Sequence, residues 1–248
     1  MLSSVRYFGL LYLAVTFVFF GTILLEFQLA HYIIKPAFMI LLIAFMRNQP
    51  NGSSGTFAKL IQFGLFFSWI GDVALMFPDD SGVLFLVGLS SFLIAHLGYS
   101  FGFYKNIRTS EKPFKYRQAA AYAIPFVLIT GPFFYYLKDG LPSELFFPVL
   151  AYTLVISTMG IFSAWRTDHV RSKTFVWMLV GAILFILSDC VLALNIFDIQ
   201  PEKHSATAKA LAIANMILYL GGQFMIAVGA VYHQEDLSSE QVDSALSA

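Results

Sequence analysis

The stretch that decides the fold is TFVWMLVGAILFILSDCVLALNI, residues 174–196. It is apolar along its length apart from one charged residue, Asp189, and a helix that spans a bilayer needs about 20 such residues. A backbone inside hydrocarbon has no water to bond, so the segment is expected to be helical. Seven similar stretches are found at residues 7–25, 31–46, 57–77, 82–105, 117–136, 143–165 and 207–232. The sequence therefore predicts an all-α membrane bundle of eight transmembrane helices over residues 1–232, with a polar cytoplasmic tail over residues 233–248.

The composition supports this class and excludes others. Of the 248 residues, 58% are apolar, 17% aromatic and only 12% charged, whereas a soluble globular protein needs a far more polar surface. The single cysteine, Cys190, excludes a disulfide framework and a thiolate metal cluster. The formal net charge is zero, so the chain lacks the electrostatic signature of nucleic-acid binding.

The distribution of Lys and Arg between the two sides of the bundle predicts its orientation. Most of the 15 basic residues fall on the side that holds both termini. The exceptions are Lys35, Lys138, Lys203 and Lys209. Because cytoplasmic loops carry an excess of Lys and Arg, both termini are expected in the cytoplasm.

Two segments of the chain resemble each other. In residues 64–75 and residues 181–192, a glycine precedes an aspartate by eight positions and a leucine follows it by three. Four helices separate these segments, and this spacing is typical of a 4+4 parallel repeat about an axis along the membrane normal.

The aspartates of these segments, Asp72 and Asp189, are the informative residues. A charged side chain in the middle of a membrane costs about 2.5–3.5 kcal/mol on insertion scales, so one that persists usually faces the bundle interior. Both aspartates lie on the order of 10 Å below the same surface at roughly 1.5 Å per residue, on helices that run in the same direction. We expect the two carboxyls to meet, and we expect burial and mutual repulsion to keep one of them protonated.

Other polar residues of the spans are expected around the two carboxyls. His96 and Tyr99 share one helical face, as do Tyr219 and Gln223, because each pair is three or four residues apart. The expected pocket is completed by Lys35, Asn195 and Asn215. Each of these residues also has a purely structural interpretation. The aspartates could bond helices together with Lys35, Lys35 could extend to the interface, and the others could be interhelical hydrogen-bonding groups.

Several kinds of site are excluded by spacing. The sequence has no G-x-S-x-G elbow, no H-E-x-x-H and no glycine-rich phosphate loop, so serine hydrolases, zinc proteases and nucleotide-binding proteins are not favoured. An intramembrane aspartyl protease would need G-x-G-D and Y-D. Trp69 stands in place of the first glycine, and Ser188 in place of the tyrosine.

Four segments together resemble the lysoplasmalogenase family of eight-span membrane proteins. They are FSWIGD at 67–72, FLIAHLGY at 92–99, GAILFILSDCVLALN at 181–195 and YLGGQ at 219–223. The resemblance extends from Lys35-Pro36 to the eighth span. It implies hydrolysis of the vinyl ether of lysoplasmalogens to a fatty aldehyde and glycerophosphoethanolamine or glycerophosphocholine, without a metal or organic cofactor. It also implies the endoplasmic reticulum in a eukaryotic host and the inner membrane in a bacterial one.

The predicted residues suit this chemistry. Vinyl ether hydrolysis needs a carboxylic acid that protonates carbon and a carboxylate that activates water, roles that we expect for Asp72 and Asp189. Coupled carboxyls titrate as a pair, so the sequence leaves the acid and the base unassigned. His96, Tyr99, Tyr219 and Gln223 are expected to orient water or the glycerol hydroxyl, and Lys35 to bind the phosphate.

Two functions of other classes stay open from the sequence. A proton-coupled transporter would use the same carboxylates and a repeat, and a structural or sterol-sensing membrane protein would have no turnover. The oligomeric state is also left open.

Overall fold

A computed structural model describes residues 2–50, 55–77, 82–110 and 112–247. All regular structure in these ranges is helical, which confirms the predicted all-α class. The long helices are α1 (Leu2–Leu24), α2 (Gln28–Arg47), α3 (Gly55–Ala74), α4 (Val83–Thr109), α5 (Tyr116–Leu137), α6 (Phe146–Trp165), α7 (Ser172–Leu194) and α8 (Ala206–Ser247). Short helical turns are η1 (Lys138–Gly140), η2 (Ser143–Leu145) and the π-helical η3 (Asn195–Ile199).

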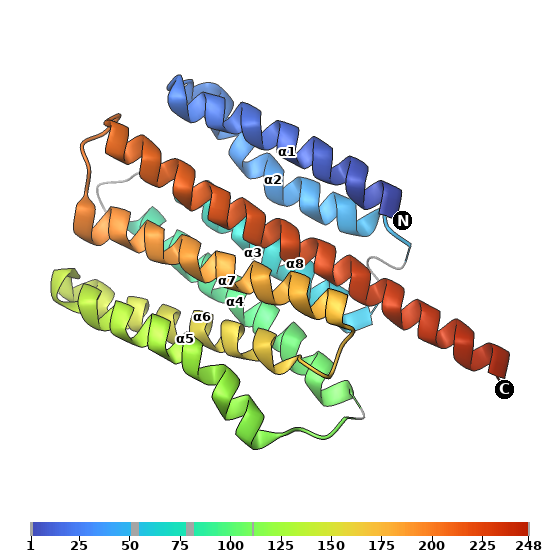
Figure 1. The fold of residues 1–248 in the computed structure, drawn as a ribbon. Coiled ribbons are helices and arrows are strands. Elements are labelled where there is room, and N and C mark those ends of the chain that lie inside the picture. Colours follow the sequence, from blue (N-terminus) through green and yellow to red (C-terminus); the bar gives the residue numbers. More distant parts are fainter. Residues whose placement is uncertain (1, 51–54, 78–81, 111, 248) are drawn as a thin grey trace.

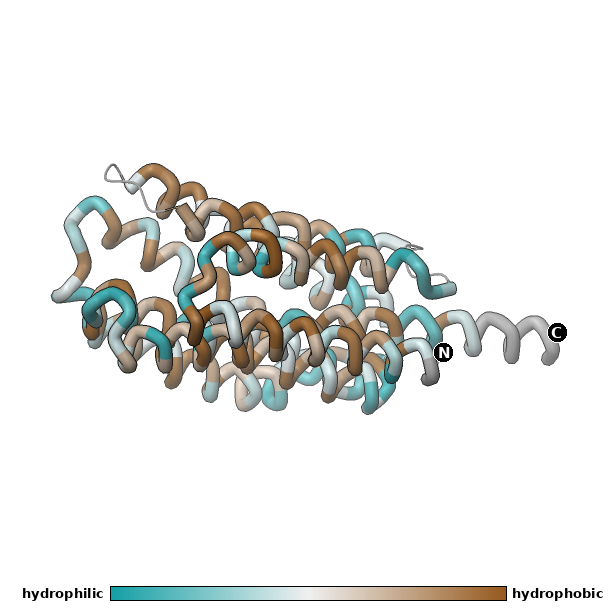
Figure 2. The backbone as a smooth tube through the Cα atoms, turned by 90° about the horizontal axis from the view of Figure 1, so that it is seen from above, coloured by the Kyte–Doolittle hydropathy of each residue, from teal (hydrophilic) through white to brown (hydrophobic). Residues whose placement is uncertain are grey.

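The bundle is a multi-pass membrane protein by the length and composition of its helices. Within the described ranges, eight helices are long and apolar enough to cross a bilayer. Apolar residues dominate their central parts, and hydrophilic residues gather toward the ends (Figure 2). Large apolar side chains such as Phe17, Leu128 and Tyr135 are 73%, 65% and 70% exposed. Such exposure is costly in water but favourable against acyl chains, so these side chains mark the lipid-facing surface.

The helices pack in the pattern that a 4+4 repeat predicts. Within the first half, α1 packs on α2, α2 on α3, and α3 on α4, and the second half repeats these contacts as α5 on α6, α6 on α7, and α7 on α8. Between the halves, the contact of α4 with α6 has its counterpart in that of α8 with α2. The pairs α1–α2 and α5–α6 flank a central group formed by α3, α4, α7 and α8 (Figure 1).

The closest helix contact is between α7 and α8, where two glycines face each other. A Cβ added at Gly181 would lie 2.9 Å from the carbonyl oxygen of Gly222, and one added at Gly222 would lie 2.9 Å from that of Gly181. Small residues let helix backbones approach in membranes, where packing rather than hydrophobic burial drives association. This contact fixes α7, which carries Asp189, against α8, which carries Tyr219.

Both termini lie at one end of the bundle, and α8 projects beyond it there (Figure 1). The helix continues without a break through the segment that the sequence predicts as a polar tail. The first residues of this segment, His233 and Gln234, are only 8% and 5% exposed, so the bundle extends further along α8 than hydropathy alone indicates.

Candidate active site

Asp72 and Asp189 line one cavity of about 390 Å³ near the end of the bundle opposite the termini. Asp72 comes from the last turn of α3 and Asp189 from the last turns of α7. Four of the other residues predicted for the pocket line the same cavity: Lys35, Asn195, Asn215 and Tyr219. The described residues place no direct hydrogen bond between the two carboxyls, so the cavity lies between two separately held acids.

Asp72 is held by a tyrosine and a lysine. Its carboxyl is 3% exposed and accepts a hydrogen bond of 2.6 Å from the Tyr219 hydroxyl on α8. The Lys35 Nζ atom, on α2, lies 3.9 Å from the second carboxyl oxygen. A cation beside a buried carboxylate offsets part of the cost of removing the charge from water, and Lys35 is the cation that does so for Asp72.

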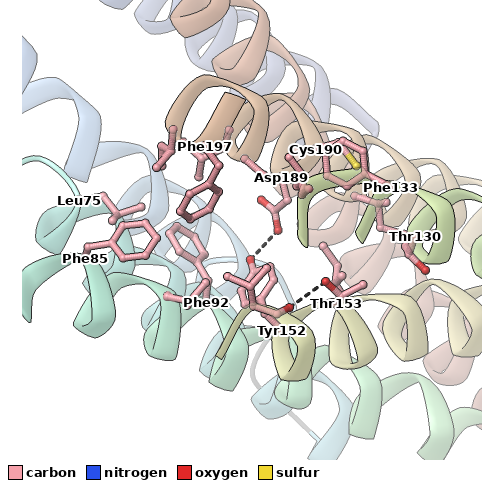
Figure 3. Close-up of a pocket in the computed structure, with 18 residues that line it drawn as sticks. Leu75, Phe85, Phe92, Thr130, Phe133, Tyr152, Thr153, Asp189, Cys190 and Phe197 are labelled. Carbon is pink, nitrogen blue, oxygen red and sulfur yellow. Dashed lines mark hydrogen bonds between the residues drawn. The ribbon is translucent and has the colours of Figure 1, made fainter. Parts of the chain in front are cut away.

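Asp189 is held by a tyrosine and a histidine instead. The Tyr152 hydroxyl, on α6, donates to Asp189 Oδ2 at 2.5 Å (Figure 3). His96 Nε2, on α4, lies 3.0 Å from the Tyr152 oxygen and 3.3 Å from Asp189 Oδ2. With a proton on Nε2, the His96 ring can serve both oxygens as a donor. The surroundings of Asp189 thus contain hydrogen-bond donors but no lysine or arginine ion pair among the described residues.

Sequence reasoning missed Tyr152, although the repeat contains a signal for it. Lys35 precedes Asp72 by as many residues as Tyr152 precedes Asp189. One and the same shift along the sequence therefore carries Lys35 to Tyr152 and Asp72 to Asp189. Tyr152 therefore occupies in the second half the place that Lys35 occupies in the first. Aligning the two halves along their full length, rather than only around the aspartates, would have identified it.

A second cavity continues from Asp189 into apolar surroundings. It has a volume of about 90 Å³ and lies among α4, α5, α6 and α7 (Figure 3). Its walls are almost entirely apolar, with Phe85, Phe92, Phe133 and Phe197 among them, and the Tyr152 hydroxyl and Asp189 carboxyl stand at its polar end. Asp189 lines this cavity and the one shared with Asp72. Asp189 therefore lies at the junction of the apolar cavity and the cavity shared with Asp72.

A third cavity, of about 430 Å³, continues from Lys35 toward the surface. Lys203, His204 and Lys209 line it together with Glu26. Glu26 Oε1 accepts a hydrogen bond of 2.6 Å from Lys209, and Glu26 Oε2 lies 3.2 Å from His204 Nδ1. The hydrogen bond from Lys209 lowers the pKa of Glu26, so this carboxyl is ionised at neutral pH. The cavity that the two aspartates share thus adjoins the charged surface cavity at Lys35 and the apolar cavity at Asp189.

Two of the predicted site residues lie beneath the cavities. The Tyr99 hydroxyl donates to Gln223 Oε1 at 2.8 Å, and Gln223 Nε2 donates to Ser68 Oγ at 2.9 Å. Both residues are fully buried, and neither lines any of the three cavities. This network joins α3, α4 and α8 one helical turn below Asp72.

Asn195 begins the π-helical turn η3 at the end of α7. Such turns interrupt regular helices and are frequent at functional sites. Ser188, beside Asp189, donates a hydrogen bond of 2.7 Å to Asn215 on α8. These contacts fix the end of α7 at the wall of the cavity. In the described part of the chain, no group of three His, Cys, Asp or Glu side chains is placed to hold a metal ion.

Comparison with known proteins gives the chain its family. The model of the YhhN family matches residues 30–230, which is most of the chain: it includes α3 to α7 whole, most of α2 and the first part of α8. The chain belongs to the YhhN family. Lys35, Asp72, His96, Tyr152 and Asp189 all lie within the part matched to the family.

Curated relatives of this YhhN-family chain have informative names. It is 29% identical to human "Lysoplasmalogenase TMEM86B" over 72% of its length and 66% of the relative, and 30% identical to the pig protein of the same name over 75% and 69%. It is 28% identical to a "Lysoplasmalogenase homolog" of Dictyostelium discoideum over 72% and 65%. The chain thus spans about two thirds of the length of these relatives. The resemblance to the lysoplasmalogenase family is confirmed, and no solved structure matches.

Proposed function

We propose that this protein hydrolyses the vinyl ether bond of lysoplasmalogens, releasing a fatty aldehyde and glycerophosphoethanolamine or glycerophosphocholine. One observation carries the proposal: two carboxyls from separate helices line one cavity, and that cavity continues into an apolar one. A lipid with a single chain needs such a continuous polar and apolar space. The relatives named lysoplasmalogenase support the same reaction.

We assign the proton donor to Asp189 and the carboxylate to Asp72. Asp189 borders the apolar cavity, where the carbon atoms next to the vinyl ether would lie, and its partners are the hydrogen-bonding side chains of Tyr152 and His96. Asp72 lines only the cavity that it shares with Asp189. It lies beside the Lys35 ammonium, which favours its ionised form. Two carboxyls in different surroundings can take opposite roles in acid–base catalysis.

The reaction then follows in three balanced steps. Asp189 donates its proton to the β-carbon of the vinyl ether, which gives an oxocarbenium ion. Water adds to the α-carbon and gives its proton to Asp72, and a hemiacetal results. The protonated Asp72 returns this proton to the glycerol oxygen as the carbon–oxygen bond breaks, while the hemiacetal hydroxyl gives its proton to Asp189. The products are an alcohol and an aldehyde, and both carboxyls recover their starting states.

The three adjoining cavities suggest how the substrate is oriented. The carbons of the alkenyl chain nearest the vinyl ether would enter the apolar cavity, the vinyl ether would lie between the carboxyls, and the glycerophosphate would point toward Lys35. Lys203 and Lys209 would meet the phosphate in the surface cavity. Phosphate pairs favourably with such ammonium groups.

The remaining predicted residues receive positioning roles. Tyr219 would orient the Asp72 carboxylate through its hydrogen bond, and His96 would orient Asp189. Tyr99 and Gln223 would support the cavity from below by joining α3, α4 and α8. Asn195, on the cavity wall, is suited to bind the glycerol hydroxyl or water.

The protein's surroundings are also part of the proposal. Both termini would face the cytoplasm, so the cavity with the two aspartates would open on the opposite side of the membrane. The membrane would be the endoplasmic reticulum in a eukaryotic cell and the inner membrane in a bacterium.

The test is aldehyde release by the purified protein supplied with a lysoplasmalogen. Asp72→Asn and Asp189→Asn should each lower the rate by at least about 10³-fold, because general acid–base groups contribute on the order of 10²–10⁴ and both carboxyls act in each turnover. Asp139→Asn is the matched control, since the Asp139 side chain is 82% exposed and lies outside the three cavities. Substantial turnover by either cavity variant would refute the paired-acid mechanism. Ester lysolipids serve as the negative substrate control.

A proton-coupled transporter remains the second candidate, because the repeated helix contacts are typical of transporters. Transporter sites usually lie in broken helices, whereas α3 and α7 are continuous through Asp72 and Asp189. Gradient-driven flux into sealed vesicles, without aldehyde release, would favour this function over hydrolysis.

A further inference from the structure

A buried arginine lies at the end of the bundle opposite the two aspartates. Arg166 directly follows α6 and is 0% exposed. Its Nε atom donates to Asn106 Oδ1 at 3.0 Å and its Nη1 atom to Met178 Sδ at 2.8 Å, while its Nη2 atom is buried without a hydrogen-bond partner. The rings of Phe57 and Phe103 lie 5.5 and 5.0 Å from the guanidinium carbon. In the described ranges, Arg166 forms no ion pair with a carboxylate.

This environment does not balance the charge of Arg166. Burial lowers the pKa of the guanidinium to about 9, which still leaves the group charged at neutral pH. Buried charges in proteins are normally paired, and an amide oxygen, a thioether and two aromatic faces carry no net negative charge. The energetics therefore call for an anion close to Arg166.

A cavity of about 1040 Å³ adjoins the side chains that surround this arginine. Two side chains that contact Arg166, Phe57 and Asn106, form part of its wall. Asn106 Nδ2 also donates to His233 Nε2 at 2.9 Å, and His233 lines the cavity as well. One layer of polar and aromatic side chains thus separates the cavity from the buried charge.

The rim of this cavity is also basic. Lys105 and Lys112 line it and form no ion pair within the described part of the chain. Of the other charged lining residues that the structure describes, Arg171 pairs with Asp236, and Asp168 pairs with Lys115. Among the described residues, the charges without an ion pair at this site are therefore all positive: two lysines at the rim and the arginine beneath.

We propose that this cavity binds an anion of the phosphate class, held by Lys105, Lys112 and Asn106, and that the anion provides the missing counter-charge for Arg166. The phosphate can belong to a lipid with a phosphomonoester head group, such as phosphatidic acid, or to a soluble phosphate compound. Both present a terminal phosphate with several acceptor oxygens and more than one negative charge at neutral pH, which suits ammonium and amide donors. The site is separate from the cavity of the two aspartates and does not depend on the proposed hydrolysis.

The test measures binding rather than turnover. Full-length protein in phosphatidylcholine nanodiscs is titrated with inorganic pyrophosphate by calorimetry, at constant ionic strength set with chloride. In the lipid arm, the thermal unfolding midpoint is compared between nanodiscs with and without about one fifth phosphatidic acid. Binding or stabilisation in either arm supports the site, and the responding arm identifies the source of the phosphate.

Matched variants decide whether the response arises at this site. Lys105→Gln with Lys112→Gln should weaken the response at least about tenfold, because both cations face the anion. Arg108→Gln with Arg117→Gln removes the same charge from exposed positions outside the cavity and should leave the response unchanged. Arg166→Met should also remove the response, and the lysine variant decides alone if Arg166→Met does not fold. The absence of a response in both arms, or equal responses from the two double variants, would refute the proposal.

Discussion

Asp72 and Asp189 hold matching places in the two halves of the chain, but their partners differ. The place taken by Lys35 beside Asp72 is taken by Tyr152 beside Asp189. A lysine stabilises a carboxylate by its charge, whereas a tyrosine only donates a hydrogen bond. Each acid also has a second partner, Tyr219 beside Asp72 and His96 beside Asp189. The difference between the two acids in the proposed mechanism therefore comes from both pairs of neighbours.

We predict that Tyr152→Phe slows aldehyde release by roughly 10–100-fold, because a hydrogen bond to a charged group contributes about 1.5–3 kcal/mol. The rate of aldehyde release by the purified variant, measured beside that of the unchanged protein, checks this prediction. An unchanged rate would contradict the positioning role of Tyr152. Tyr104→Phe, on the exposed face of α4, is the control and should leave the rate unchanged.

The polar residues of the site were only partly predictable from the sequence. Asp72 and Asp189 stand out because charges are rare in apolar helices, and their shared depth follows from counting residues. Tyr152 does not stand out, since tyrosine is common in membrane helices and only packing brings α6 next to α7. Tyr99 and Gln223 look the same in sequence as cavity residues, because a helical face can point to a cavity or to a neighbouring helix.

At the scale of elements, helix existence followed from hydropathy, but helix ends and neighbours did not. The apolar runs predict all eight spans because each must satisfy its own backbone in lipid. Hydropathy does not predict the extension of α8 past His233, because burial there depends on polar contacts such as that of Asn106 with His233. The neighbours of each helix depend on side-chain packing, for which only the glycines give a signal.

The contact of α7 with α8 gives a prediction at this scale. Gly222→Ala should destabilise the protein by about 1–3 kcal/mol, as overpacking does, because the new methyl group would lie 2.9 Å from a backbone oxygen that cannot move aside easily. Gly221→Ala is the neighbouring control, since its Cβ would meet only the Leu184 side chain at 3.5 Å. Thermal unfolding in detergent measures both. Equal midpoints for the two variants would contradict the close-contact interpretation.

For the whole molecule, the excess of Lys and Arg at the end with the termini predicts the orientation in the membrane. The test uses single cysteines in a Cys190→Ala background, in a bacterial inner membrane, with a maleimide that does not cross the membrane. Glu202→Cys, on the side of the aspartates, should react in spheroplasts with an intact inner membrane. Thr109→Cys, at the opposite end, should react only after permeabilisation. The reverse pattern would invert the proposed topology.

The repeated architecture has a further consequence for how such a protein could arise. Two copies of one four-helix unit, facing each other, would present a pair of equivalent acids with the same affinity for a proton, and neither would be favoured as donor. Different neighbours around the two acids, with Lys35 in one copy at the place of Tyr152 in the other, break this equivalence. A duplicated scaffold can thus acquire a division of labour without any change in its backbone.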